Sequence, residues 1–217
     1  MTSIQLSVWL NGVGACAEAR AWARLMDPRA AWEECPRADW LIWLCARVGV
    51  DRAKIARAVA ACVRQVLPIW ERRFPEDGRP RGAVEALEAW AEGRLGPDEV
   101  RSAVEASLDA ANEAEVKAAQ TCGSSTRRWY ELDAANEAEV KAARVVDAAL
   151  AAADAASFAV FPAGHEAAGA ASRAFVYTAS AVARGWGGEG ERLKEYASIV
   201  REHVPYDELL RIWEGVE

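Results

Sequence analysis

The twelve residues LDAANEAEVKAA occupy positions 108–119, and the same letters occur again at positions 132–143. Two identical copies so close together indicate that a segment was duplicated recently. Each copy is rich in alanine, the strongest helix former, so both are expected to be helical. Because the run CGSST at 122–126 interrupts the helical pattern, we predict an αα-hairpin of two antiparallel helices. A single continuous helix is the alternative.

Each copy also carries charged side chains at a spacing of four residues. Asp109 and Glu113 in the first copy, and Asp133 and Glu137 in the second, form two rows that each end in a lysine. Residues four apart share a helix face, and an acid–lysine pair of this kind stabilises a helix by only about 0.2–0.5 kcal/mol. The simplest interpretation is an ordinary solvated surface. The alternative is that these four acids bind a partner.

The composition of the whole chain favours the same architecture. More than a fifth of the 217 residues are alanine, and ten are tryptophan. Alanine faces let helices approach closely, and the large indoles supply buried apolar area. With 52% hydrophobic residues, the chain is long enough to bury one sizeable core. We therefore predict an all-α, multi-helix bundle that forms a single domain over residues 1–217.

Capping residues and helix breakers place the individual helices. Asp27-Pro28 and Asp51 are N-terminal signals, because aspartate caps free backbone N–H groups and proline fits the first turn. Gly49 and Gly93 are stop signals. Together with the 3.6-residue apolar periodicity, these signals predict helices at 15–26, 28–35, 37–48, 51–68, 83–92, 97–121, 126–156, 164–184, 191–203 and 205–213.

Two segments are expected to lack helix, and one helix is expected to be central. Residues 1–14 should be a lead-in, because Gly12 and Gly14 stop a helix, and PEDGRPRG at 75–82 should be a loop. Residues 164–184 carry few charges and many small side chains. A helix that is apolar on most sides belongs in the interior, so we expect 164–184 at the centre of the bundle.

The distribution of charge restricts the partners. The net charge is −7, and residues 101–217 carry the whole excess of acid. Nucleic-acid binding needs a basic stripe, and the sequence shows none. An acidic half either attracts a basic partner or is simply solvated. No membrane span is expected either, because the most apolar stretch, 145–164, consists largely of alanine and is interrupted by two aspartates.

The cysteines indicate a reducing compartment. Five cysteines lie far apart in the chain, and an odd number without a CxxC pair argues against a disulfide framework. No signal peptide is evident at the start of the sequence. We therefore expect free thiols and a cytoplasmic protein.

Motifs for chemistry are missing from the sequence. His165 and His203 are the two histidines, and neither has the spacing of a zinc or di-iron site. Gly185, Gly187 and Gly190 spell GxGxxG, but a helical pattern leads into them, so a loop is the better interpretation. No nucleophile–base–acid constellation is evident. The sequence thus predicts no cofactor, no metal and no enzyme.

A group of aromatic residues near the Cys35-Pro36 turn is a candidate for a binding surface. Trp40 and Trp43 are three apart, which suggests packing in the core. Trp32 and Asp39 border the turn, and an exposed indole beside a carboxylate would suit a binding surface. Buried tryptophans with a capping aspartate are the favoured interpretation. We keep Trp32, Asp39 and Trp40 as candidate binding residues.

Several stretches, in order, resemble a known family. DWLIWL at 39–44, RPRGAVEALEAWAEG at 79–93 and IVREHVP at 199–205 resemble the alanine-rich bacterial and phage immunity proteins of the Imm-5-like group. The resemblance covers roughly 14–103 and the C-terminal helix. It implies a small cytoplasmic helical protein that neutralises a toxin, and it brings no catalytic residue with it.

Three functions follow from these observations. The first is a non-catalytic immunity-type protein that masks a toxin or another protein partner. The second is a self-associating scaffold, whose alanine-rich faces dock between chains. The third is an enzyme, which would need an aromatic-lined cavity with a carboxylate or His165 facing inward.

Overall fold

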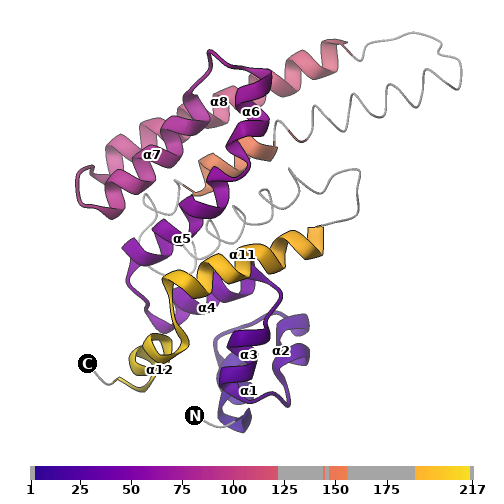
Figure 1. Cartoon of the computed structure of the whole chain (residues 1–217), viewed down its shortest axis with the longest axis vertical. Coiled ribbons are helices and arrows are strands. Elements are labelled where there is room, and N and C mark those ends of the chain that lie inside the picture. The colour runs from indigo at the N-terminus through magenta and orange to yellow at the C-terminus, as the bar shows by residue number, and fades with distance from the viewer. Residues whose placement is uncertain (1–2, 122–143, 145–146, 156–188, 216–217) are drawn as a thin grey trace, which may run out of the picture.

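The structure, a computed structural model, describes residues 3–121, 144, 147–155 and 189–215. All regular secondary structure in these residues is α-helical, which confirms the predicted all-α class. The helices form an elongated molecule with two ends and a middle (Figure 1). One end holds α6 (Leu67–Arg73), α7 (Arg79–Ala91) and α8 (Pro97–Thr121), the middle holds α4 (Ala38–Val48), α5 (Arg52–Arg64) and α11 (Glu189–His203), and the other end holds α1 (Ser3–Gly12), α2 (Ala17–Ala23), α3 (Pro28–Glu34) and α12 (Tyr206–Glu214).

The predicted caps are present at three helix ends. Asp27 accepts hydrogen bonds from the backbone N–H groups of the first turn of α3, and Asp51 accepts one from Ala53 at the start of α5. Gly49 ends α4 with φ at +95°, a left-handed conformation that glycine adopts without a steric penalty. These local signals set the boundaries of the helices from Asp27 to Asp51.

Two predictions of non-helical chain are wrong. Residues 3–12 form α1, because Gly12 ends this helix at its C-terminus rather than preventing it. α7 begins at Arg79, inside the loop expected at 75–82. Pro80 lies in the first turn of α7, where a missing backbone N–H costs nothing and the fixed φ of proline suits the helix.

The main core follows the periodicity of α5. Ile55, Val59, Cys62 and Val66 recur at three- and four-residue spacing, and all four are buried, as the sequence predicts. α5 contacts α7 on one side and α11 on the other, so this row lies between the two ends of the molecule. The sequence expects α5 to bend or end at Pro68, and the chain there starts the short helix α6.

Alanines of α8 and of the helical segment 147–155 lie in the same buried core beneath α8. Ala110, Ala111 and Ala114 of α8 are buried, and so are the alanines of the helical segment 147–155. Ser107 is fully buried in α8, and its Oγ donates a hydrogen bond of 3.0 Å to the carbonyl oxygen of Ala149. Side chains the size of a methyl group let the two backbones approach closely enough for this contact.

Several predictions fall outside the described residues. These are the second repeat copy at 132–143, hence the second arm of the αα-hairpin, and the helix at 164–184 expected in the centre. Within the described part of the chain, the most enclosed segment is 147–155. The single-domain organisation stays a prediction.

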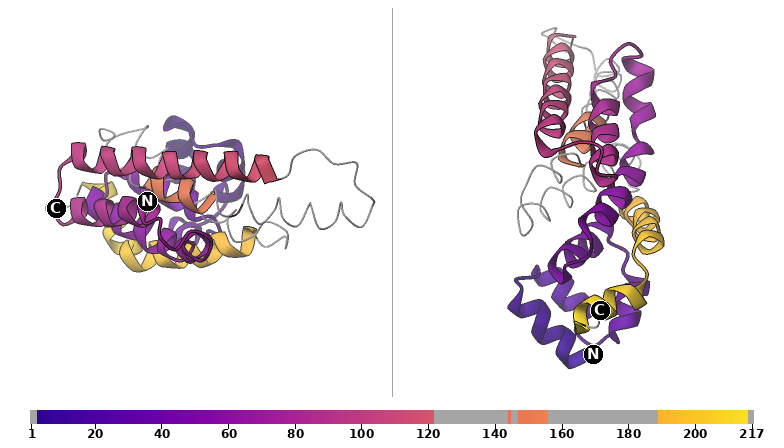
Figure 2. Two further views of the ribbon diagram at one scale, coloured as in Figure 1. Left: turned by 90° about the horizontal axis from the view of Figure 1, so that it is seen from above. Right: turned by 90° about the vertical axis from the view of Figure 1, so that its left-hand side faces the viewer.

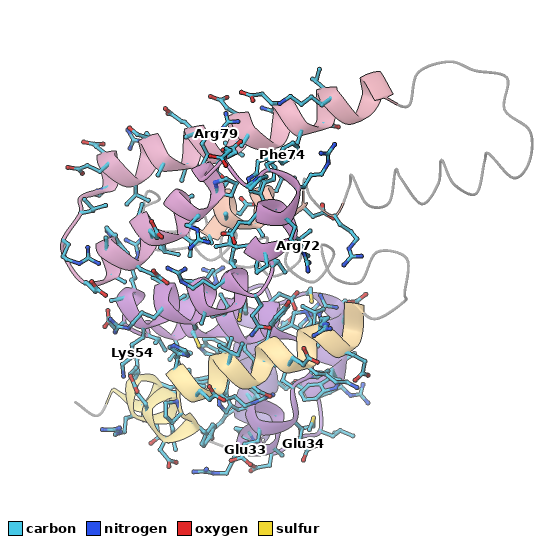
Figure 3. The ribbon with its side chains drawn as sticks, turned by 45° about the horizontal axis from the view of Figure 1, so that its top comes forward. Glu33, Glu34, Lys54, Arg72, Phe74 and Arg79 are labelled. Carbon is cyan, nitrogen blue, oxygen red and sulfur yellow. The ribbon has the colours of Figure 1, made fainter. Side chains whose placement is uncertain are left out.

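The C-terminal helices close the N-terminal end of the molecule (Figure 2, right). Arg201 of α11 donates hydrogen bonds to the carbonyl oxygens of Trp32, at 2.9 Å, and Cys35, where α3 ends. Lys54 of α5 forms an ion pair of 2.6 Å with Glu208 of α12 (Figure 3). Residues about 150 positions apart in the chain are thereby held together at this end.

The alanine contact predicts a specific sensitivity to size. Ala111→Leu should lower the free energy of unfolding by about 1–3 kcal/mol, because extra methyl groups in a packed interface force strain on both helices. The control is Asn112→Leu at the exposed neighbouring position of α8, which should change stability far less. Chemical denaturation measures both variants. Equal losses in the two would contradict close packing under α8.

Candidate functional site

A cleft of about 410 Å³ lies at the end of the molecule formed by α1, α2, α3, α4 and α12. We call it the aromatic cleft, because six aromatic rings contribute to its wall among the described residues. Small and aliphatic side chains from α1, α2 and α3 fill the spaces between these rings. The six rings are those of Trp22, Trp32, Trp40, Trp43, Tyr206 and Trp213.

Local helix geometry positions these rings. Trp40 and Trp43 lie three residues apart on α4 and therefore project to the same side. The ring of Trp22 from α2 meets Trp40 edge-on, with 6.5 Å between centroids and 62° between planes. Trp9 of α1 packs on Trp213 of α12 with a centroid distance of 4.2 Å, which fixes the C-terminal helix beside the cleft.

An ion pair forms the polar part of the cleft wall. Arg37 donates two hydrogen bonds to Asp39, from Nε to Oδ1 at 2.8 Å and from Nη2 to Oδ2 at 2.6 Å. These bonds raise the pKa of the Arg37 guanidinium above its ordinary value. The Arg37 guanidinium also lies over the ring of Trp40 at 4.9 Å. Exposed Cys16 and Glu18 border the same side.

The structure brings the three N-terminal candidates together. Trp32, Asp39 and Trp40 all line the aromatic cleft. Trp32 is only 3% exposed, which agrees with core packing and not with an exposed indole at the turn. Asp39 is only 8% exposed, and it pairs with Arg37 in the first turn of α4 in place of the expected cap. Their role in binding stays a prediction.

The acidic candidates of the first repeat copy lie elsewhere. Asp109 and Glu113 are exposed on α8, at the opposite end of the molecule from the aromatic cleft (Figure 1). Asp133 and Glu137 lie outside the described residues. The candidate residues therefore do not form one site.

Glu113 has an internal partner that the helix-face prediction did not include. Arg79 of α7 donates to both carboxylate oxygens of Glu113 at 2.9 Å, and it also pairs with Asp77 (Figure 3). These hydrogen bonds hold the pKa of Glu113 below its ordinary value. Lys117 lies with Nζ 5.6 Å from the ring centre of Phe74. Part of the charged row thus fastens α8 onto the turn between α6 and α7.

Sequence reasoning missed four of the six rings of the aromatic cleft. Trp43 was assigned to core packing alone, and Trp22, Tyr206 and Trp213 were not considered, because two of these come from the far end of the chain and only tertiary packing brings them to α4. The sequence signal that could have indicated this cleft was the high density of tryptophan in the first 43 residues, together with Trp213 near the C-terminus.

Other kinds of site are restricted within the described residues. No group of three or more His, Cys, Asp or Glu side chains in this part of the chain is arranged to hold a metal ion. No helix among the same residues is long and apolar enough to cross a membrane. His203 lies in the last turn of α11, with Nδ1 2.9 Å from the carbonyl oxygen of Ile199, and His165 lies outside the described residues.

Part of the chain is similar to a known protein family. Residues 49–127, just over a third of the chain, match the family described as Imm-5 like putative immunity protein. The match confirms the resemblance seen in the sequence and includes α5, α6, α7 and α8. No curated protein and no solved structure matches the chain. The aromatic cleft lies wholly outside the matched segment.

The buried thiol of Cys35 at the cleft predicts a pH effect. Burial raises its pKa from 9.0 to about 11, so the thiol ionises more easily in the unfolded chain. Its contribution to stability is therefore complete below pH 9 and is lost as the pH rises toward 11. At pH 10 this loss is about 1 kcal/mol. Cys35→Ala should show a shallower fall in unfolding free energy between pH 8 and pH 10 than the parent. Identical slopes would contradict the raised pKa.

The Arg79–Glu113 pair predicts a measurable electrostatic change. Arg79→Gln should move the pKa values of Glu113 and Asp77 upward, because the hydrogen bonds that hold both of them low are lost. NMR titration of the side-chain carboxyl carbons measures both. The control Arg101→Gln removes an exposed arginine on α8, the helix that carries Glu113, and the titration of Glu113 should then match that in the parent. A shift of similar size in that control would point to general charge rather than to the pair.

Proposed function

We propose that the protein is a non-catalytic, immunity-type binding protein that masks a protein partner, such as a toxin. The match of residues 49–127 to the Imm-5-like family carries this proposal. A mask needs a preformed surface rather than reacting groups, and the closely packed helices of this segment provide one. A cytoplasmic location would suit this role and the four thiols found free in the described residues.

The partner-binding surface is best sought within the matched segment. One side of α8 points away from the helices beneath it and combines acids with exposed aliphatic side chains. Leu108 is 40% exposed and Val116 is 55% exposed, so two aliphatic side chains lie among the acids on this side. We call this side the outer face of α8 and define it by Glu105, Leu108, Asp109, Asn112, Glu115 and Val116.

The outer face of α8 has the composition of a docking surface. Protein interfaces commonly place apolar residues at the centre and charged residues at the rim. Here Leu108 and Val116 would supply the apolar contacts, while Glu105, Asp109 and Glu115 would attract a basic partner. Glu113 would contribute mainly by holding α8 in place, because its carboxylate is already bound by Arg79 of α7.

The two other functions make different demands on the same structure. A self-associating scaffold needs alanine-rich faces that are free to dock between chains, whereas those described on α8 and in 147–155 are buried within the chain. The mass of the protein in solution tests this alternative. An enzyme would use the aromatic cleft, which does hold a carboxylate. However, the Asp39 carboxylate is bound at both oxygens by Arg37, and that arrangement suits a structural ion pair better than a catalytic base.

The experiment that tests the function starts from the native host. Tagged full-length protein is cross-linked at low salt, and captured proteins are identified by mass spectrometry. Each captured protein is then expressed in a test strain with and without this chain. We expect one of them to be toxic alone and harmless with this chain. If none is toxic, or if toxicity persists in its presence, the immunity function is wrong.

Charge reversal tests the outer face of α8. The double variant Glu105→Lys/Asp109→Lys should weaken binding of the captured partner by about tenfold or more, mainly through slower association that varies with salt. The control is Glu34→Lys/Glu202→Lys, which changes net charge equally at exposed positions on α3 and α11. Surface plasmon resonance at two salt concentrations measures the affinity and the association rate of both double variants. Similar affinities for the two double variants would place the partner elsewhere.

A further inference from the structure

The aromatic cleft has the dimensions of a small-molecule site. Such sites commonly have volumes of about 300–1,000 Å³ and mostly apolar walls with a few polar groups. The aromatic cleft, at about 410 Å³, falls in this range. Its walls combine six aromatic rings with aliphatic side chains such as Leu6, Leu10 and Leu44, and its charged side chains, Glu18, Arg37 and Asp39, lie near one another.

The charges around the cleft favour a neutral occupant. Arg37 and Asp39 compensate each other through two short hydrogen bonds, so the wall offers no net charge at that point. Glu18 is exposed at the edge and keeps its contact with water. A charged ligand would lose hydration on entering the apolar part and gain little in return. A neutral ligand avoids this cost.

The rings also favour a flat, aromatic occupant. Trp22 and Trp40 meet edge-to-face. This arrangement presents both ring faces, which are partly negative, and ring edges, which are partly positive, along the wall. Aromatic groups prefer offset or edge-to-face contacts with such rings, and each contact adds to the gain from burial alone. The polar side, made by Cys16, Glu18 and Arg37, suits a single polar end on the ligand.

We propose that the aromatic cleft binds a neutral, planar aromatic small molecule, whose polar end lies beside Arg37 and Cys16. This site is separate from the proposed immunity function. Its residues come from α1 to α4 and α12, and none lies within the family-matched residues 49–127. Failure of either proposal therefore leaves the other intact.

The test uses N-phenyl-1-naphthylamine, a neutral aromatic probe whose fluorescence rises in apolar surroundings. Ala19 of α2 lines the cleft and is only half-buried, so Ala19→Phe fills the cleft without removing core side chains. We expect this variant to bind the probe about tenfold or more weakly than the parent. The matched control, Ala21→Phe, adds the same ring at an exposed position of the same helix and should bind within about twofold of the parent.

A second measurement leaves every residue of the cleft unchanged. Cys16 is exposed beside the cleft, whereas Cys35, Cys45 and Cys62 are buried. In a Cys122→Ser background, alkylation of Cys16 should slow about tenfold when the probe is saturating, since the ligand would cover the thiol. Peptide mass spectrometry assigns the modified residue. Sodium 1-naphthalenesulfonate, an anionic aromatic compound, should protect Cys16 far less.

The outcomes separate the possible occupants. Weaker probe binding by Ala19→Phe together with protection of Cys16 supports the proposal. Equal binding by Ala19→Phe and Ala21→Phe, or an unprotected Cys16, overturns it. Equal protection by the anionic compound overturns the preference for a neutral ligand. If light scattering shows a dimer of the parent that Ala19→Phe dissociates, a second copy of the chain occupies the cleft, and the proposal is wrong.

Discussion

The structure depends on the contact between alanine faces beneath α8. Ala110, Ala111 and Ala114 are buried in the same core as the alanines of 147–155, and the buried Ser107 hydroxyl donates a hydrogen bond from α8 to the backbone of Ala149. Small side chains contribute little apolar area each, so the stabilisation comes from many close contacts between two backbones. The buried residues Ser107, Ala110, Ala111 and Ala114 share one side of α8, so this side faces the core. Leu108 and the acids of the outer face consequently point to solvent.

At the end of the molecule that holds α1, α2 and α3, large side chains rather than alanines make the contacts between helices. There α1, α2 and α3 are short, and short helices gain little from their own hydrogen bonds. Indole rings span the distances between them, and Arg201 fastens the end of α3 to α11 through backbone carbonyl oxygens. Large rings that contact each other edge-on pack less densely than closely approaching alanine side chains. The aromatic cleft is the volume that they leave.

The sequence predicts local features well and distant contacts poorly. Asp27, Gly49 and Asp51 act through groups two to four residues away, so the boundaries of α3, α4 and α5 could be placed without tertiary information. α1 was missed because glycine signals an end without showing whether a helix precedes it. The pairing of Arg79 with Glu113, and the meeting of Trp22 with Trp213 at one cleft, depend on packing between segments that no spacing rule connects.

The positions of the two surfaces bear on how they could act together. α8 lies at the opposite end of the molecule from α1, α2, α3 and α12, with α5 and α11 between them (Figures 1 and 2). The outer face of α8 and the aromatic cleft, which is lined by those helices and α4, are therefore far apart. Energetic coupling between distant sites requires an element with two arrangements whose balance both sites change. α5 and α11 form a buried, closely packed middle that favours one arrangement. Substitutions on the two surfaces should therefore have additive effects on stability, and each surface should bind without regard to the other.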